Sequence, residues 1–235
     1  MIIWAGTSNK DVGMIIEHYP SVVLPRKSQE IQQVPGRNGD VVLENDSYEN
    51  YEQKYSAFLD AKYIGRLERV IPKVVDWLLG HPGYQRLEDS YFPDVYRMAY
   101  YQGGTEFISI FNEYGEGTLI FNCAPEKYYK IGEKAINVTS GQVLKNISVF
   151  PAFPIITVKG SGRGVLDFNG KQLVITNINS EVTIDVKKHR AFNGSESRNS
   201  TISGLYENLK LYEETEIGWS GGITGVTIIP RWWTI

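Results

Sequence analysis

The sequence predicts a mainly β protein with two domains and one helix in the first of them. Short apolar alternations recur along the chain between turn-forming residues, which is the pattern of β-strands. One segment, near residues 64–80, has helical spacing instead. No helical segment separates the strands of the second half, which favours an antiparallel sandwich there.

A change in aromatic content divides the chain. Thirteen of the fifteen tyrosines fall within residues 19–129, whereas residues 140–204 contain neither Tyr nor Trp. A polar stretch at 130–134 lies between these regions. We therefore predict a first domain at residues 1–135 and a second at 136–235.

The composition is that of an ordinary globular protein, with 42% hydrophobic and 22% charged residues among 235. A net charge of −3 without basic runs argues against a nucleic-acid-binding surface, because phosphate binding needs clustered Lys and Arg. No apolar run approaches the roughly 20 residues that span a bilayer, and the N-terminus lacks the pattern of a signal peptide. Neither membrane insertion nor secretion is indicated.

The first domain has six predicted strands, at Met14–Ile16, Val41–Leu43, Tyr51–Leu59, Tyr96–Tyr101, Phe107–Phe111 and Gly117–Phe121. Its helix is predicted from apolar residues at helical spacing, namely Ile64, Leu67, Ile71, Val74, Val75 and Leu78. Pro72 removes a helical hydrogen bond, so the helix either begins at Pro72 or kinks there. We expect the apolar stripe to pack against the sheet.

In the second domain the predicted strands begin at Ile155–Val158 and end at Val226–Ile229. Asn169-Gly170 tolerates positive φ at both positions and predicts a type I′ hairpin turn. The glycine-rich run Gly160–Gly164 lacks the Lys-Ser/Thr ending of a phosphate-binding loop, so we interpret it as a second hairpin turn.

Residues that carry chemistry are sparse. The three histidines have no zinc-ligand spacing, and Cys123 lies in an apolar run typical of a buried small residue. Gly218-Trp219-Ser220-Gly221-Gly222 matches the hydrolase elbow, but no Asp, Glu or His follows it to complete a triad. Four carboxylates remain open as members of an acid pair, although turn and strand positions explain them better: Glu113, Glu116, Asp167 and Asp185. We predict no catalytic residue, no cofactor and no metal.

Several segments together resemble the distal tail protein (Dit) family of long-tailed phages, of the siphophage type. The resemblance covers nearly the whole chain through the segments 34–40, 51–59, 75–78, 87–97, 121–129, 151–162, 183–185 and 229–233. It implies a ring-forming N-terminal β domain with one helix and a galectin-like β-sandwich as the C-terminal domain. Proteins of this family are not enzymes at this length.

The resemblance also implies a role in the virion. Such proteins form a homo-hexameric hub at the distal end of the phage tail, assembled in the host cytoplasm. The hub joins the major tail tube protein to the tail-associated lysin or fibre protein and to receptor-binding or baseplate proteins. DNA passes through its centre without tight binding, which agrees with the acidic net charge.

Ring-interface candidates come from the first domain. Gly36, Arg37, Asn38 and Gly39 predict a hairpin turn, and we expect that arm to contact a neighbouring copy. Tyr48, Tyr51 and Tyr55 have a side chain suited to interfaces, and placement in the core is an equal alternative.

A second function remains open from the sequence, because a β-sandwich can also be a carbohydrate-binding module for host-surface recognition. Trp219, Trp232 and Trp233 are its candidate sugar platforms.

Overall fold

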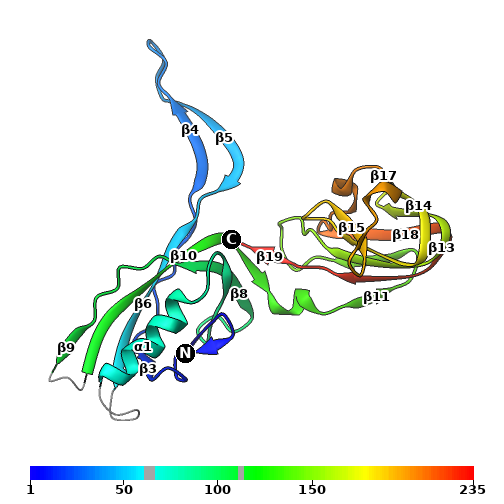
Figure 1. Ribbon diagram of the computed structural model, residues 1–235. Coiled ribbons are helices and arrows are strands. Elements are labelled where there is room, and N and C mark those ends of the chain that lie inside the picture. The colour runs from blue at the N-terminus through cyan, green and yellow to red at the C-terminus, as the bar shows by residue number, and fades with distance from the viewer. Residues whose placement is uncertain (61–66, 111–113) are drawn as a thin grey trace. The chain divides into compact units, whose positions relative to one another are not determined.

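The structure is a computed structural model that describes residues 1–60, 67–110 and 114–235. Two compact units divide the chain: unit 1 comprises Met1–Lys127 with Ile235, and unit 2 comprises Tyr128–Thr234 (Figure 1). The described residues form strands and a single α-helix, which confirms the predicted mainly β fold. Compact units do not test independent folding, so the domains at 1–135 and 136–235 stay a prediction.

Unit 1 is an antiparallel sheet covered by one helix. Its main strands follow the order β2-β1-β7-β8-β10-β6-β3, with β9 paired to β10. Their bounds are Ile2–Trp4 (β1), Thr7–Ser8 (β2), Met14–Ile16 (β3), Tyr51–Asp60 (β6), Gln85–Asp89 (β7), Val95–Tyr101 (β8), Ile108–Ile110 (β9) and Tyr114–Tyr129 (β10). Every second residue of β6 is buried, from Tyr51 to Leu59, because alternate side chains of a strand point to one face.

The helix α1 (Leu67–Leu79) holds Pro72 in its interior, so the alternative that it begins at Pro72 is wrong. Its buried face differs from the predicted one. Val70, Val74, Trp77 and Leu78 are at most 4% exposed and belong to the core. Within the predicted stripe, Val74 and Leu78 are buried, whereas Ile71 and Val75 are exposed. The predicted member Ile64 lies outside the described residues.

Unit 2 is built on three long strands that pair in the order β14-β13-β18. They are β13 (Ile155–Phe168), β14 (Lys171–Asp185) and β18 (Glu214–Ile229). Shorter strands flank them: β11 (Ile136–Val138), β12 (Gln142–Lys145), β15 (Arg190–Asn193), β16 (Glu196–Ser197) and β17 (Ile202–Ser203). The strand β19 (Trp233–Thr234) pairs with β10 instead. Three single 3-10 turns complete the unit: η2 (Lys130–Glu133), η3 (Asn199–Thr201) and η4 (Tyr206–Leu209).

The two ends of β13 enclose the same core. Ile156 and Val158 from its first part, and Leu166 and Phe168 from its last, are at most 1% exposed and lie in one cluster. The long strands therefore bend and bring two layers together over a shared core, as in a β-sandwich. The β13–β14 hairpin turns at Asn169 and Gly170 with φ of 53° and 81°, which confirms the predicted turn.

The predicted hairpin turn at Gly160–Gly164 is wrong, because these glycines lie inside β13 at the bend. The pairing register of β13 shifts there against both neighbours. A Cβ at Gly222 of β18 would lie 1.7 Å from the Ser161 carbonyl oxygen. Glycine at this position therefore permits two backbones to approach at bulges, a need that sequence composition does not distinguish from a turn.

Candidate assembly surface

A β-hairpin in unit 1 pairs with neither sheet. It consists of β4 (Lys27–Gln32) and β5 (Val41–Tyr48), which form a separate two-stranded sheet. Figure 1 shows it as a ribbon that projects from the strands of unit 1. We call residues 27–48 the arm. Its base is closed by a hydrogen bond from the Glu49 amide to the Arg26 carbonyl at 2.8 Å.

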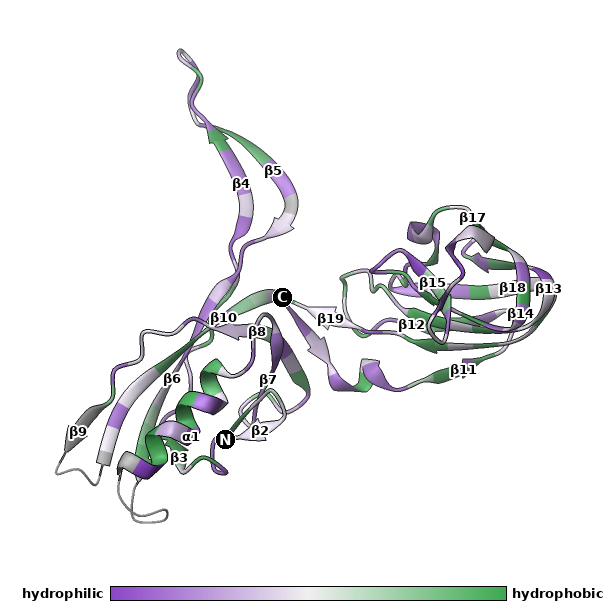
Figure 2. Cartoon of the chain, viewed as in Figure 1, coloured by the Kyte–Doolittle hydropathy of each residue, from purple (hydrophilic) through white to green (hydrophobic). Residues whose placement is uncertain are grey.

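The arm leaves apolar side chains in solvent. Ile31 is 60% exposed, and Val34, Val42 and Leu43 are each between 45% and 47% exposed. Figure 2 shows hydrophobic segments on both strands of the arm. Ile31 and Val42 stand opposite each other in the register and therefore share one face of the hairpin. Because a lone two-stranded hairpin is marginally stable in water, these side chains indicate a surface that another protein covers.

The predicted turn residues form the tip of the arm. Gly36 and Gly39 have φ of 84° and 83°, a left-handed conformation that favours glycine. Arg37 and Asn38 between them are exposed. Tyr48 ends β5 at the arm's base and is half-buried. The assignment of these residues to a ring interface stays a prediction.

Tyr51 and Tyr55 occupy the core of unit 1, at 6% and 1% exposure. The Tyr55 hydroxyl donates to Asp89 Oδ2 at 3.0 Å, and Arg97 donates to the Tyr51 hydroxyl at 3.0 Å. Arg97 also donates to Asp89 Oδ2 at 2.6 Å, which closes a buried network. Burial raises the pKa of both phenols, so they stay neutral donors and acceptors. We drop both tyrosines from the interface candidates because their side chains face inward.

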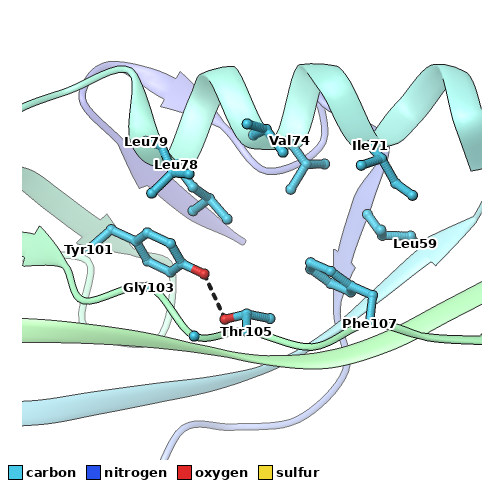
Figure 3. A pocket seen from close by; sticks show the side chains of 11 residues that line it. Leu59, Ile71, Val74, Leu78, Leu79, Tyr101, Gly103, Thr105 and Phe107 are labelled. Carbon is cyan, nitrogen blue, oxygen red and sulfur yellow. Dashed lines mark hydrogen bonds between the residues drawn. The ribbon is translucent and has the colours of Figure 1, made fainter.

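A groove runs beside α1, on a surface that the sequence predicted to be covered. Ile71, Val75 and Leu79 recur every four residues and are 40%, 45% and 63% exposed. Ile71 and Val75 therefore correct the expectation that the whole stripe packs on the sheet. These three side chains line a groove of about 250 Å³. Figure 3 shows Ile71 and Leu79 on the helix side of the groove, facing Tyr101 and Phe107. No periodicity signal would have found it, because buried and exposed apolar positions look alike in sequence.

The two side-chain hydroxyls in the groove are hydrogen-bonded within the protein. Tyr101 Oη donates to Thr105 Oγ1 at 2.7 Å, and Thr105 Oγ1 donates to the Thr118 carbonyl at 2.8 Å (Figure 3). The walls are otherwise mostly aliphatic and aromatic, and the volume lies below the roughly 300–1,000 Å³ of small-molecule sites. The groove therefore suits apolar side chains of a protein better than a polar ligand.

The described residues contain no group of three or more His, Cys, Asp and Glu side chains placed to hold a metal. The Gly218–Gly222 segment lies within β18, not on the strand-to-helix turn that a nucleophile elbow needs. Cys123 is fully buried, as predicted, and burial raises the pKa of its thiol to about 12. None of the described helices is long and apolar enough to cross a membrane.

Two of the four open carboxylates, Asp185 and Asp167, have structural partners. Asp185 Oδ1 accepts from Arg231 Nη2 at 2.7 Å, and Asp167 Oδ1 accepts from the Gly170 amide at 2.7 Å in the hairpin turn. Glu116 lies on β10 in unit 1, and Glu113 lies outside the described residues. These positions agree with the strand and turn interpretation.

Two of the three tryptophan candidates for sugar binding are engaged inside unit 2. Trp232 is 8% exposed within the core. Trp233 donates its indole N–H to the Pro151 carbonyl at 3.0 Å and stacks on Phe150. Trp219 is half-buried and packs against the same core. Carbohydrate binding thus stays a prediction, with Trp219 and Trp233 as the partly exposed rings among its three candidates.

No family model and no curated protein matches the sequence. Among solved structures, the SPP1 Dit (gp 19.1) protein has a TM-score of 0.78 at 14% identity, with 100% of this chain and 98% of that chain covered. The chain has the Dit fold. The resemblance predicted from the sequence is confirmed at this level, since such identity establishes the fold and not the function.

Two baseplate structures are more distant matches. A chain of the phage P2 baseplate in its activated conformation with Ca is 8% identical, covers 92% of this chain and 89% of that chain, and has a TM-score of 0.48. The form with Sr is 11% identical with 92% and 90% covered, at a TM-score of 0.44. At these scores we draw no conclusion from either. The SPP1 protein is described as a paradigm of the hub adsorption apparatus in phages infecting Gram-positive hosts.

Proposed function

We propose that this protein is a structural, non-enzymatic hub at the distal end of a phage tail. The observation that carries the proposal is a Dit fold that covers 100% of this chain. The exposed arm and the groove on unit 1 support it, because an assembly protein needs apolar surface that its partners cover.

In this role the chain forms a homo-hexameric ring through unit 1. Unit 2 is then the galectin-like β-sandwich displayed on the outside of the ring. The ring joins the major tail tube protein to the tail-associated lysin or fibre protein and to receptor-binding or baseplate proteins. DNA passes through the central channel. The net charge of −3 supports a conduit, because a surface without clustered Lys and Arg releases few counterions and retains little DNA.

The test is the mass of the purified chain in solution, measured by light scattering after size exclusion over a wide range of concentrations. We expect a species of six chains that grows with concentration, since assembly follows mass action. Electron micrographs of that peak should show rings with a central hole. A strict monomer at every concentration, with affinity for glycans in a binding screen, would contradict the hub and favour the carbohydrate-binding alternative.

A further inference from the structure

Unit 1 carries two uncovered apolar surfaces of complementary shape. The arm is a narrow projection with Ile31, Val34 and Val42 near its tip. The groove beside α1 is a hollow of about 250 Å³ flanked by Ile71, Val75, Leu79 and Phe107. A projection of aliphatic side chains matches the chemistry of a hollow whose walls are mostly apolar and whose two side-chain hydroxyls are already hydrogen-bonded.

The two surfaces lie at opposite ends of β6. The arm joins the first residue of that strand, Tyr51, through Tyr48, whereas Leu59 near the strand's other end lines the groove. Eight residues of extended strand separate these ends by about 26 Å. Both surfaces are exposed in the chain itself, so the arm does not fill the groove of its own copy.

Charge complementarity favours this pairing too. The arm's tip carries the exposed Arg37. Asp76 is exposed on α1 next to Val75 and three residues before Leu79, so it borders the apolar stripe. The last turn of α1 contains no basic residue, which leaves its C-terminal carbonyls as an additional negative end. A positively charged side chain is therefore stabilised when it lies at this end of the groove.

We propose that the arm of one copy docks into the α1 groove of the next copy, with Arg37 beside Asp76. This inference rests on the proposed function and names the contact that closes its ring. Because arm and groove are different surfaces of one chain, the contact is head-to-tail, the type that generates closed rings.

The size of the contact sets its strength. Seven side chains that are about half exposed bury on the order of 300 Å² of apolar surface when they dock: Ile31, Val34, Val42, Leu43, Ile71, Val75 and Leu79. A stable pair needs at least roughly 1,200 Å². A single arm–groove contact is therefore one part of the interface. In a ring each copy makes this contact twice, once through its arm and once through its groove.

The first test places a charge in either surface. Ile31→Lys on the arm and Val75→Lys in the groove should each reduce the mass from six chains towards one at concentrations where the unchanged protein is fully assembled. Val149→Lys is the matched control, because Val149 is 85% exposed on unit 2. Circular dichroism and thermal unfolding check that every variant is folded. Folded Ile31→Lys and Val75→Lys variants that keep the sixfold mass would overturn the inference.

The second test exchanges the charges. Arg37→Glu and Asp76→Arg should each raise the concentration needed for half-assembly about threefold, the size of a partly exposed ion pair. The double variant should return it to the original value, because each contact then regains an opposite pair. An additive loss in the double variant would rule out the proposed partners.

The third test separates this inference from the proposed function. A chain with Ile31→Cys and Val75→Cys should cross-link under mild oxidation into a ladder of up to six chains. A mixture of the two single variants should stop at dimers, and Val149→Cys with Val75→Cys should give no ladder. A sixfold mass without any ladder would leave the hub standing and refute the arm–groove contact, whereas a monomer without a ladder would refute both.

Discussion

The two units of the molecule treat apolar surface in opposite ways. Of the large apolar residues exposed in the described chain, thirteen belong to unit 1 and six to unit 2, although unit 1 is only slightly the longer. Seven of the thirteen in unit 1 lie on the arm and along α1. Unit 1 therefore exposes more of the apolar surface that protein partners cover.

Their interiors differ as well. Unit 2 closes over an apolar cluster made by bent strands, and its buried Asp185 lies near the edge with Arg231. Unit 1 holds the ion pair between Asp89 and Arg97 in its centre, with both side chains at most 3% exposed. A buried ion pair contributes little net stability but makes its loss costly, so the two interiors should respond differently to substitution.

The largest effect should come from Arg97→Met in unit 1. It leaves the Asp89 carboxylate buried without its cation, which costs about 3–5 kcal/mol of unfolding free energy. Hydrogen exchange should accelerate in β6 and β10 and stay slow in β13 and β14. Adding Asp89→Asn should recover part of the loss, because the uncompensated charge is gone. A cost below about 1 kcal/mol would show that the network is not the centre of the unit 1 core.

Next in size is Gly222→Ala in unit 2. Its Cβ would lie 1.7 Å from the Ser161 carbonyl oxygen, so the backbones must separate at a cost of about 2–3 kcal/mol. Gly225→Ala is the control in the same strand, because nothing lies within 4 Å of its Cβ. Urea unfolding of both variants makes the comparison. Equal stabilities would mean that the bend in unit 2 does not depend on the close approach.

A smaller, pH-dependent effect is expected at Asp185. Partial burial raises the pKa of its carboxyl, but the hydrogen bonds and charge of Arg231 outweigh this and leave the pKa below its ordinary 3.8. A lowered pKa stabilises the folded state above pH 3.8, and this contribution is lost as the pH falls through the folded value. Asp185→Asn should cost about 1 kcal/mol at pH 7 and less near pH 2. Urea unfolding at the two pH values tests it, and a pH-independent difference would argue against the ion pair.

The smallest effect should be that of Leu205→Ser in unit 2. Leu205 is 67% exposed and belongs to neither the arm nor the groove, so the unfolding free energy should change by less than about 0.5 kcal/mol. The mass in solution should also stay the same. Loss of assembly in this variant would remove the contrast between the two units.

Local patterns predicted much of this fold. The strand Tyr51–Leu59 and the Asn169-Gly170 turn follow from the chemistry of neighbouring residues, and both were found in place. The glycines at Gly160–Gly164 were misassigned because a bulge and a turn demand the same backbone freedom. Only the pairing with β18, some sixty residues further along the chain, decides between them.

The interface candidates show the same limit. Tyr51 and Tyr55 face inward because Asp89 and Arg97, more than thirty residues away in sequence, provide partners for their hydroxyls. The tip residues Gly36–Gly39 were recognisable as a turn from their composition alone. That the arm stands apart from the sheet, and that α1 leaves Val75 uncovered, depends on tertiary packing that periodicity does not encode.

The closure of the arm at its base has a consequence for how this protein can diverge. Since the Glu49 amide and the Arg26 carbonyl are already joined, the segment between them is an insertion whose ends meet. Adding or removing residue pairs there leaves both ends of the segment in place, and loop-closure entropy grows slowly with length. The reach of the arm can thus change without a change in the sheet beneath it, and a docking groove is what would hold that reach to one length.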